Sequence, residues 1–162
     1  MQLYTLTVMS KKSIAFLMLL IISPIVIYLL WPTEESRIIK LIKNGAKAVE
    51  AKNVDDVMSK ISYTYTDQYA INYLVIKEAL QREFQRINTI SVECDITRVE
   101  VMQKEKEKTA SARVDVRVII TAGKEAGYIV GDAAKPAHLS LSLEKGPTGW
   151  LINSVEGIKL EF

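Results

Sequence analysis

Cysteine and histidine are almost absent from this sequence: Cys94 and His138 are the only residues of their types. One cysteine excludes a disulfide within the chain, so the folded part must be stabilised by its hydrophobic core. The two residues fall on different predicted strands and match no spacing typical of zinc ligands. The glycines of residues 123–131 form neither a phosphate-binding loop nor a dinucleotide-binding pattern. The sequence therefore predicts no metal site and no cofactor.

An excess of positive charge is also missing from most of the chain. Lysine and arginine total 21 against 19 acidic residues, which gives a net charge of +2. The two extra lysines, Lys11 and Lys12, precede residue 32, so the remainder carries equal numbers of basic and acidic residues. Such a neutral domain lacks the electrostatic footprint of nucleic-acid-binding proteins. We therefore expect no nucleic-acid partner.

Charged residues are absent altogether from Ser13 to Trp31. A helix of this length rises about 28 Å, close to the hydrocarbon thickness of a bilayer. Two lysines precede the run and two glutamates follow it, an asymmetry that favours a cytoplasmic N-terminus. The sequence therefore predicts a single-pass protein of the inner (plasma) membrane. Residues 1–12 would be cytoplasmic, residues 13–31 would span the bilayer, and residues 32–162 would form a periplasmic or extracellular domain.

The apolar run has three other interpretations. A cleaved signal peptide would have a small-x-small cleavage site, and none follows Trp31. A lipoprotein would need a cysteine at the end of the run, but the only cysteine is Cys94. A buried globular helix usually carries some polar positions over this length. The charge-free length favours the retained anchor, while Met1 and Met9 both remain candidate translation starts.

The residues after the anchor predict three helices. Apolar residues at helical spacing predict the first from residue 34 to about Lys52, and Asn53 can cap a second, short helix. Residues 62–67 are rich in strand formers and predict a short edge strand. From Tyr73 to Ile87 apolar residues recur every three or four positions, which predicts a long third helix.

From Thr89 onward the period changes to two, which predicts a meander of antiparallel strands. The parity slips at Arg98-Val99, as it does at a β-bulge in a long curved strand. Residues 104–108 predict a hairpin tip, and alternating strands follow over residues 114–120, 128–130 and 139–143. A turn at residues 146–149 leads to a last strand from Trp150 to Phe162.

This order of elements resembles the nuclear transport factor 2-like superfamily, the α+β cone. The resemblance covers about residues 34–162. It rests on the three helices, the Asn53-Val54-Asp55-Asp56 opening, the strand from Tyr63 to Asp67 and a final strand that opens with Trp150. It implies three helices packed on a curved antiparallel sheet. Members of the superfamily include isomerases, dehydratases and cyclases as well as binding proteins, so the fold alone does not decide the function.

The resemblance also implies a pocket at the open end of the cone, and its candidate residues here are Tyr63, Tyr65, Asp67 and Tyr73. Asp67 shares strand parity with two of these tyrosines, and partial burial would give it the pKa of a useful general base. The commoner role of such an aspartate is to cap a turn. No second ionisable group can be placed beside Asp67, so we name no catalytic residue.

On the predicted strands, charged residues alternate with apolar ones, which predicts an exposed sheet face with cross-strand ion pairs. His138 has the parity opposite to Leu139, which favours exposure over catalysis. Cys94 has core parity and is interpreted as a small buried hydrophobe. The ion-pair candidates are Asp95, Arg113, Asp115 and Arg117.

The function expected from these features is a membrane-anchored, extracytoplasmic binding or assembly domain without catalytic activity. The bilayer is its expected partner through residues 13–31, and a second copy of the chain, an envelope protein or a small apolar ligand are further candidates. The alternative is a small-molecule enzyme of the isomerase or dehydratase type, with Asp67 as general base in the cone pocket.

Overall fold

The computed structural model describes residues 18, 20, 23, 32–104 and 107–158. The chain divides into two units, Met1–Thr33 and Glu34–Phe162. Of the predicted transmembrane segment 13–31, only Met18, Leu20 and Ser23 are described, and all three are helical. The rest of that segment, and the predicted cytoplasmic residues 1–12, lie outside the described residues. Within the described residues, no helix combines the length and the apolar character needed to cross a membrane.

Three helices open the second unit, close to the bounds that the sequence predicts. They are α2 (Glu34–Glu50), α3 (Val54–Met58) and α4 (Tyr73–Arg86). Ile38 and Ile42 lie one turn apart on α2 and are both buried, because residues four positions apart share one helix face. The side chain of Asn53 caps α3 as predicted, by accepting a hydrogen bond from the backbone N–H of Asp56 at 3.0 Å.

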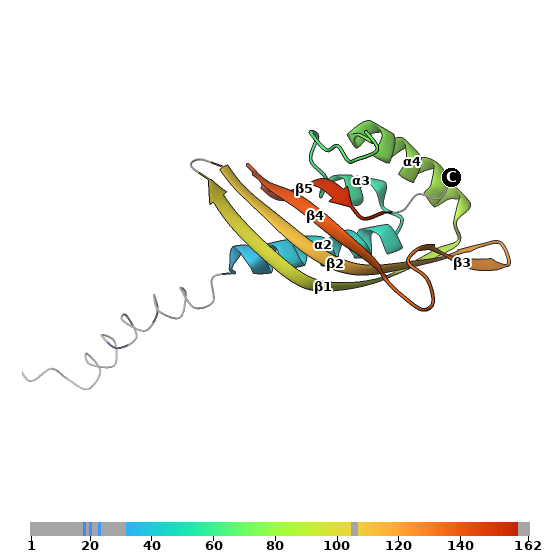
Figure 1. The fold of residues 1–162 in the computed structure, drawn as a ribbon, viewed down its shortest axis with the longest axis horizontal. Helices are drawn as coiled ribbons and strands as arrows, with labels where there is room; N and C mark the ends of the chain where they lie inside the picture. Colours follow the sequence, from blue (N-terminus) through green and yellow to red (C-terminus); the bar gives the residue numbers. More distant parts are fainter. Residues whose placement is uncertain (1–17, 19, 21–22, 24–31, 105–106, 159–162) are drawn as a thin grey trace, which may run out of the picture. The chain divides into compact units, whose positions relative to one another are not determined.

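The remaining elements form one antiparallel sheet of five strands. Its long strands bend, so the sheet is strongly curved (Figure 1). Its strands are β1 (Thr89–Lys104), β2 (Glu107–Ala122), β3 (Glu125–Val130), β4 (Ala137–Gly146) and β5 (Gly149–Glu156). The sheet order is β1-β2-β4-β5, and β3 pairs with the C-terminal part of β2. The predicted bulge is confirmed by a shift of register between Ile96 and Arg98.

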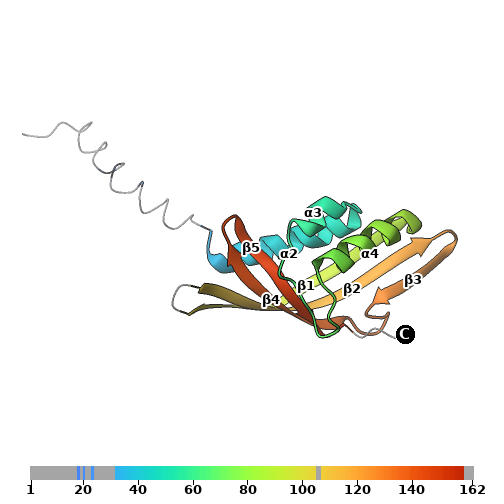
Figure 2. The same cartoon turned by 90° about the horizontal axis from the view of Figure 1, so that it is seen from above.

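The three helices lie on the same side of the sheet, and α2 supplies most of their contact with it (Figure 2). The fully buried side chains Ile38, Val114 and Leu143 join α2 to the central strands. In contrast, α4 packs chiefly against α3 and has no fully buried residue. The prediction that all three helices pack on the sheet is therefore confirmed for α2 and needs correction for α3 and α4, which mainly contact other helices.

The predicted edge strand at residues 62–67 is wrong. Only isolated bridges occur there, from Ile61 to Ile152 and from Thr66 to Asn72. The cause is competition for the backbone, since the Ser62 hydroxyl accepts a hydrogen bond from the Thr64 N–H at 3.1 Å. The alternating strand formers of this segment thus form turns instead.

The last strand is shorter than predicted. It ends at Glu156 rather than at Phe162, and residues 159–162 lie outside the described residues. Gly157 has φ +96°, which takes the chain out of the extended conformation. A Cβ at this position would lie 2.3 Å from the carbonyl oxygen of His138. The chain can therefore leave the sheet here only because residue 157 is glycine.

Candidate functional site

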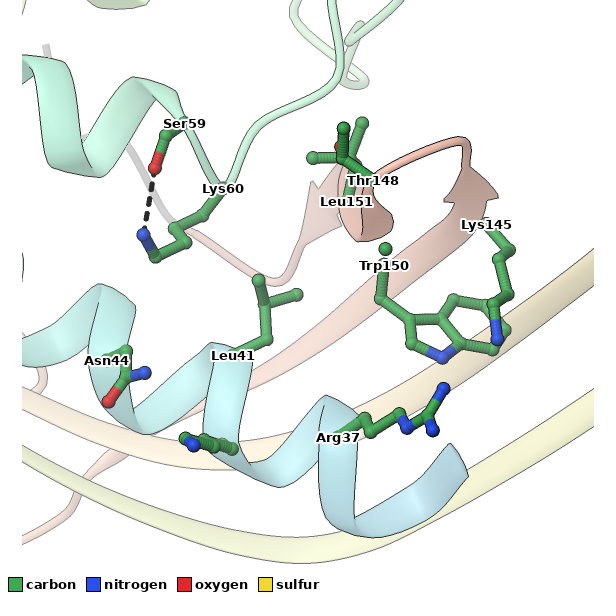
Figure 3. Close-up of a pocket in the computed structure, with 11 residues that line it drawn as sticks. Arg37, Leu41, Asn44, Ser59, Lys60, Lys145, Thr148, Trp150 and Leu151 are labelled. Atoms are coloured by element: carbon green, nitrogen blue, oxygen red, sulfur yellow. Dashed lines mark hydrogen bonds between the residues drawn. The ribbon is translucent and has the colours of Figure 1, made fainter. Parts of the chain in front are cut away.

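A groove of about 560 Å³ lies between α2, the end of α3 and the β4–β5 hairpin (Figure 3). This volume is within the usual range for small-molecule sites. Its lining combines basic, hydroxyl and apolar side chains. The lining residues are Arg37, Lys40, Leu41, Asn44, Ser59, Lys60, Lys145, Thr148, Gly149, Trp150 and Leu151.

Local structure explains why these side chains converge. Arg37, Leu41 and Asn44 follow one another at intervals of four and three on α2, so they share a helix face. The opposite wall is the β4–β5 hairpin, whose two-residue connection is closed by the pair Gly146 and Gly149. This turn is the one predicted from the sequence, and it brings β5 back beside β4 so that Trp150 reaches the groove.

Glu34 organises one end of the groove. The carboxylate accepts hydrogen bonds from the Lys145 ammonium and, at 2.7 Å, from the Trp150 indole N–H. The Lys145 hydrogen bond, followed by that of Trp150, lowers the pKa of Glu34 below its ordinary value. The Lys145 nitrogen also lies 5.5 Å from the centroid of the Trp150 ring, within cation–π range.

The other basic groups of the groove are less fully neutralised. Lys60 pairs with Asp56 at 2.7 Å and also donates to the Ser59 hydroxyl at 2.8 Å. Arg37 approaches Glu34 only to 3.9 Å. Lys40 forms no ion pair with any residue that the structure describes. Because no carboxylate of the described residues lines the groove, its surface is electropositive.

The four residues predicted for the cone pocket lie elsewhere, and none of them lines this groove. Tyr63 and Tyr73 come together, with ring centroids 4.7 Å apart, but the Tyr63 side chain is 81% exposed. Desolvation, followed by the neighbouring Tyr63, raises the pKa of Tyr73. Tyr65 is buried, and this burial, followed by the charge of Asp67, raises the pKa of Tyr65 to about 12.

Asp67 is half-buried in the turn that precedes α4. Its Oδ1 accepts hydrogen bonds from the backbone N–H groups of Tyr69 and Ile71, both at 2.9 Å. The backbone N–H of Asp67 in turn donates to the carbonyl of Ile71 at 3.3 Å. Asp67 therefore holds a closed turn, which is the commoner role for an aspartate at such a position.

The cross-strand ion pairs predicted for the sheet are confirmed for Asp115 and Arg117 only, since Asp95 lies opposite Asp115 and neither Asp95 nor Arg113 forms an ion pair with the described residues. His138 is exposed, and its Nδ1 lies 2.6 Å from Oδ1 of Asp115 on the neighbouring strand. Arg117 pairs across strands with Glu93 at 3.1 Å. Cys94 is half-buried, and burial raises the pKa of its thiol. Across the described residues, no three histidine, cysteine or acidic side chains gather as a possible metal site.

The groove is the part of the site that sequence reasoning missed. Its walls come from residues 37–44, 59–60 and 145–151, which are far apart in the chain. The only sequence signal was the pair of basic residues Arg37 and Lys40, three positions apart on a predicted helix. That signal is common to solvated helix faces and identifies no opposite wall.

No protein-family model matches the chain, and no curated protein matches it significantly. Several solved structures share its fold. A proposed scytalone dehydratase from Novosphingobium aromaticivorans is 11% identical, with a TM-score of 0.61 over 79% of this chain and 89% of that one. A ketosteroid isomerase-like protein from Erwinia carotovora is 15% identical, with a TM-score of 0.53 over 74% and 91%.

A third solved structure has the same fold and no activity attached to it. It is a domain of unknown function with a cystatin-like fold from Nostoc punctiforme, 18% identical, with a TM-score of 0.57 over 79% of this chain and 78% of that one. At such identities the likenesses show the fold alone. They support an α+β fold of the cone type, with a curved antiparallel sheet, for the second unit.

Proposed function

We propose that this chain is a membrane-anchored binding domain that holds a ligand or a partner outside the cytoplasm without transforming it. The groove between α2 and the β4–β5 hairpin carries this proposal. It has the volume of a small-molecule site, yet its lining includes no carboxylate, imidazole or thiol. The groove thus offers charge and surface for binding, but not the groups that most often transfer protons or attack a substrate.

The membrane part of the proposal rests on the charge-free run of residues 13–31 and the two lysines before it. Met18 and Leu20, two of its described residues, are helical and expose 61% and 63% of their surface. Apolar side chains of this kind suit a lipid environment better than water. A homodimer or an envelope partner, and a small apolar ligand in the cone, remain proposals beside this one.

The alternative is an enzyme that uses Asp67 as general base. The names of two similar structures, a proposed dehydratase and an isomerase-like protein, favour it. The geometry of Asp67 weighs against it, because two backbone N–H groups already bind its Oδ1. One of the two carboxylate oxygens that could take a proton from a substrate is thus already occupied within the turn.

Native mass spectrometry of the full chain, released from mild detergent, tests the proposal. We expect a mass adduct or a bound envelope protein, and we expect any bound small molecule to be recovered unchanged after long incubation. A bare monomer without adduct or partner would contradict the binding function. Conversion of the bound molecule by the wild type but not by Asp67→Asn would establish the enzyme instead.

A further inference from the structure

The groove beside α2 collects more positive than negative charge. Four cationic side chains line it, from three separate segments of the chain: Arg37 and Lys40 on α2, Lys60 after α3, and Lys145 on β4. Two carboxylates stand behind them, Glu34 beside Lys145 and Asp56 beside Lys60. Two acids against four cations leave an excess of two positive charges at the groove, although the domain as a whole has no net charge.

The least compensated charges belong to the α2 wall. Lys40 forms no ion pair with the described residues, and Arg37 is 3.9 Å from its nearest carboxylate oxygen. Both side chains are exposed, so neither is needed to fill the core. A guanidinium and an ammonium one helical turn apart form a natural pair of donors for a phosphate, whose oxygens accept several charge-assisted hydrogen bonds.

The rest of the groove fits an organic group rather than a bare ion. The available volume of about 560 Å³ is much larger than one phosphate needs. Leu41 and Leu151 supply apolar surface, while Ser59 and Thr148 supply hydroxyls. Figure 3 shows Leu41 between Asn44 and Arg37 along the α2 wall, so apolar and polar contacts alternate along the groove.

We propose that this groove binds a phosphomonoester, with Arg37 and Lys40 holding the phosphate and the apolar and hydroxyl side chains holding its organic part. A phosphomonoester carries up to two negative charges at neutral pH, which matches the excess of two positive charges better than a carboxylate does. The proposal rests on the binding function above and names its ligand class. The phosphate belongs either to a soluble compound or to a lipid headgroup.

Calorimetric titration of the full chain in phosphatidylcholine nanodiscs with phenyl phosphate tests the proposal. Arg37→Gln with Lys40→Gln should weaken binding about tenfold or more, since two charge-assisted contacts are lost. The matched control is Lys43→Gln with Lys47→Gln. It removes the same charge from exposed positions of the same helix that do not line the groove, and should change the affinity about twofold or less.

Two further titrations identify the source of the phosphate and its charge requirement. Nanodiscs in which phosphatidic acid replaces part of the phosphatidylcholine should displace phenyl phosphate if a lipid headgroup is the ligand. Undiminished binding of phenyl phosphate assigns the groove to a soluble phosphomonoester. Benzoate, which carries one negative charge, should bind at least about fivefold more weakly than phenyl phosphate.

Three results would overturn the proposal. They are equal weakening by the two double variants, equal affinity for benzoate and phenyl phosphate, and no binding of either phosphate probe by the wild type. A failure of this kind is distinguishable from failure of the binding function. In that case the mass adduct or envelope partner would still be found, and only its assignment to a phosphomonoester would fall.

Discussion

Glu34, the first residue of α2, links this helix to the opposite wall of the groove. Lys145, Lys108 and Arg37 all lie within ion-pair distance of its carboxylate, and the Trp150 indole donates to it as well. The carboxylate is only 28% exposed, so these contacts are partly shielded from water and salt. One side chain therefore fixes the relation between α2 and the β4–β5 hairpin.

Replacing Glu34 with glutamine should lower the free energy of unfolding by about 1–3 kcal/mol at neutral pH, because a charged acceptor of two side-chain hydrogen bonds is lost. The lowered pKa of Glu34 sets the pH dependence. The stability that the carboxylate adds is fully present above its ordinary pKa and is lost as the pH falls through the lowered folded pKa.

Denaturant unfolding of both proteins at several pH values measures this difference. Glu35→Gln is the matched control, since Glu35 is exposed and forms no ion pair with the residues that the structure describes. A difference between wild type and Glu34→Gln that persists unchanged in acid would contradict the assignment of the lowered pKa.

Tyr65 should ionise late in an alkaline titration, because burial, and then the charge of Asp67, raise its pKa to about 12. Absorbance near 295 nm during an alkaline titration should show a late step that is missing in Tyr65→Phe. The stability from neutral Tyr65 is present below the ordinary tyrosine pKa and is lost as the pH rises toward 12. The exposed Tyr128 provides the control, and a late step that disappears in Tyr128→Phe instead would refute the assignment.

Asp67→Ala should destabilise the fold by about 1–3 kcal/mol, because the backbone N–H groups of Tyr69 and Ile71 lose their acceptor. Asp67→Asn keeps an oxygen at this position and should recover most of the loss. Thermal unfolding followed by circular dichroism distinguishes the two variants. Equal stability of Asp67→Ala and wild type would mean that the turn does not need this side chain.

At the scale of elements, most of the fold could be predicted, because hydrophobic periodicity reports which face of each element is covered. The period of two over residues 114–120 and the period near 3.6 over residues 73–87 both predicted the observed structure. The slip of parity at Arg98 predicted the bulge. Each of these signals is local and can therefore be recognised in a single sequence.

Two predictions failed at this scale. Residues 62–67 have strand composition, but a turn in which the Tyr65 N–H donates to the Ser62 carbonyl interrupts the segment, so only isolated bridges form. The periodicity of α4 predicted an apolar face packed against the protein, but it does not predict what fraction of that face is buried. In the structure this face is only half-buried, and α4 packs mainly on the short helix α3. The residues of the face are Tyr73, Ile76, Leu80, Phe84 and Ile87.

Replacing each of two glycines with alanine should change the stability in opposite directions, because their backbone conformations differ. Gly157 has positive φ and no room for a Cβ, so Gly157→Ala should destabilise the fold by about 2 kcal/mol or more. Gly45 lies inside α2 with no neighbour within 4 Å of an added Cβ, so Gly45→Ala should stabilise it by about 0.5–1 kcal/mol. Thermal unfolding of both variants checks the pair, and a stabilising Gly157→Ala would show that β5 ends differently.

At the scale of the whole molecule, the groove is the feature that the sequence could not predict. Its formation needs the register of the β4–β5 hairpin and the packing of α2 on the sheet, which bring residues 37 and 150 together. The hydrophobic periodicity of each segment reports local structure only, so it could not predict that these two residues lie close together. Asp67 was named from the strand parity that it would share with Tyr63 and Tyr65, and the segment that would have given it this parity is not a strand.

We propose that residues 13–31 anchor the chain and that the domain from residue 34 onward binds outside the cytoplasm. The most direct test is a pair of reporter fusions at Phe162 of the full chain, one active only in the cytoplasm and one only beyond the membrane. We predict activity of the second alone, and its loss when three lysines replace Leu19, Leu20 and Ile21. Activity of the cytoplasmic reporter alone would contradict the account.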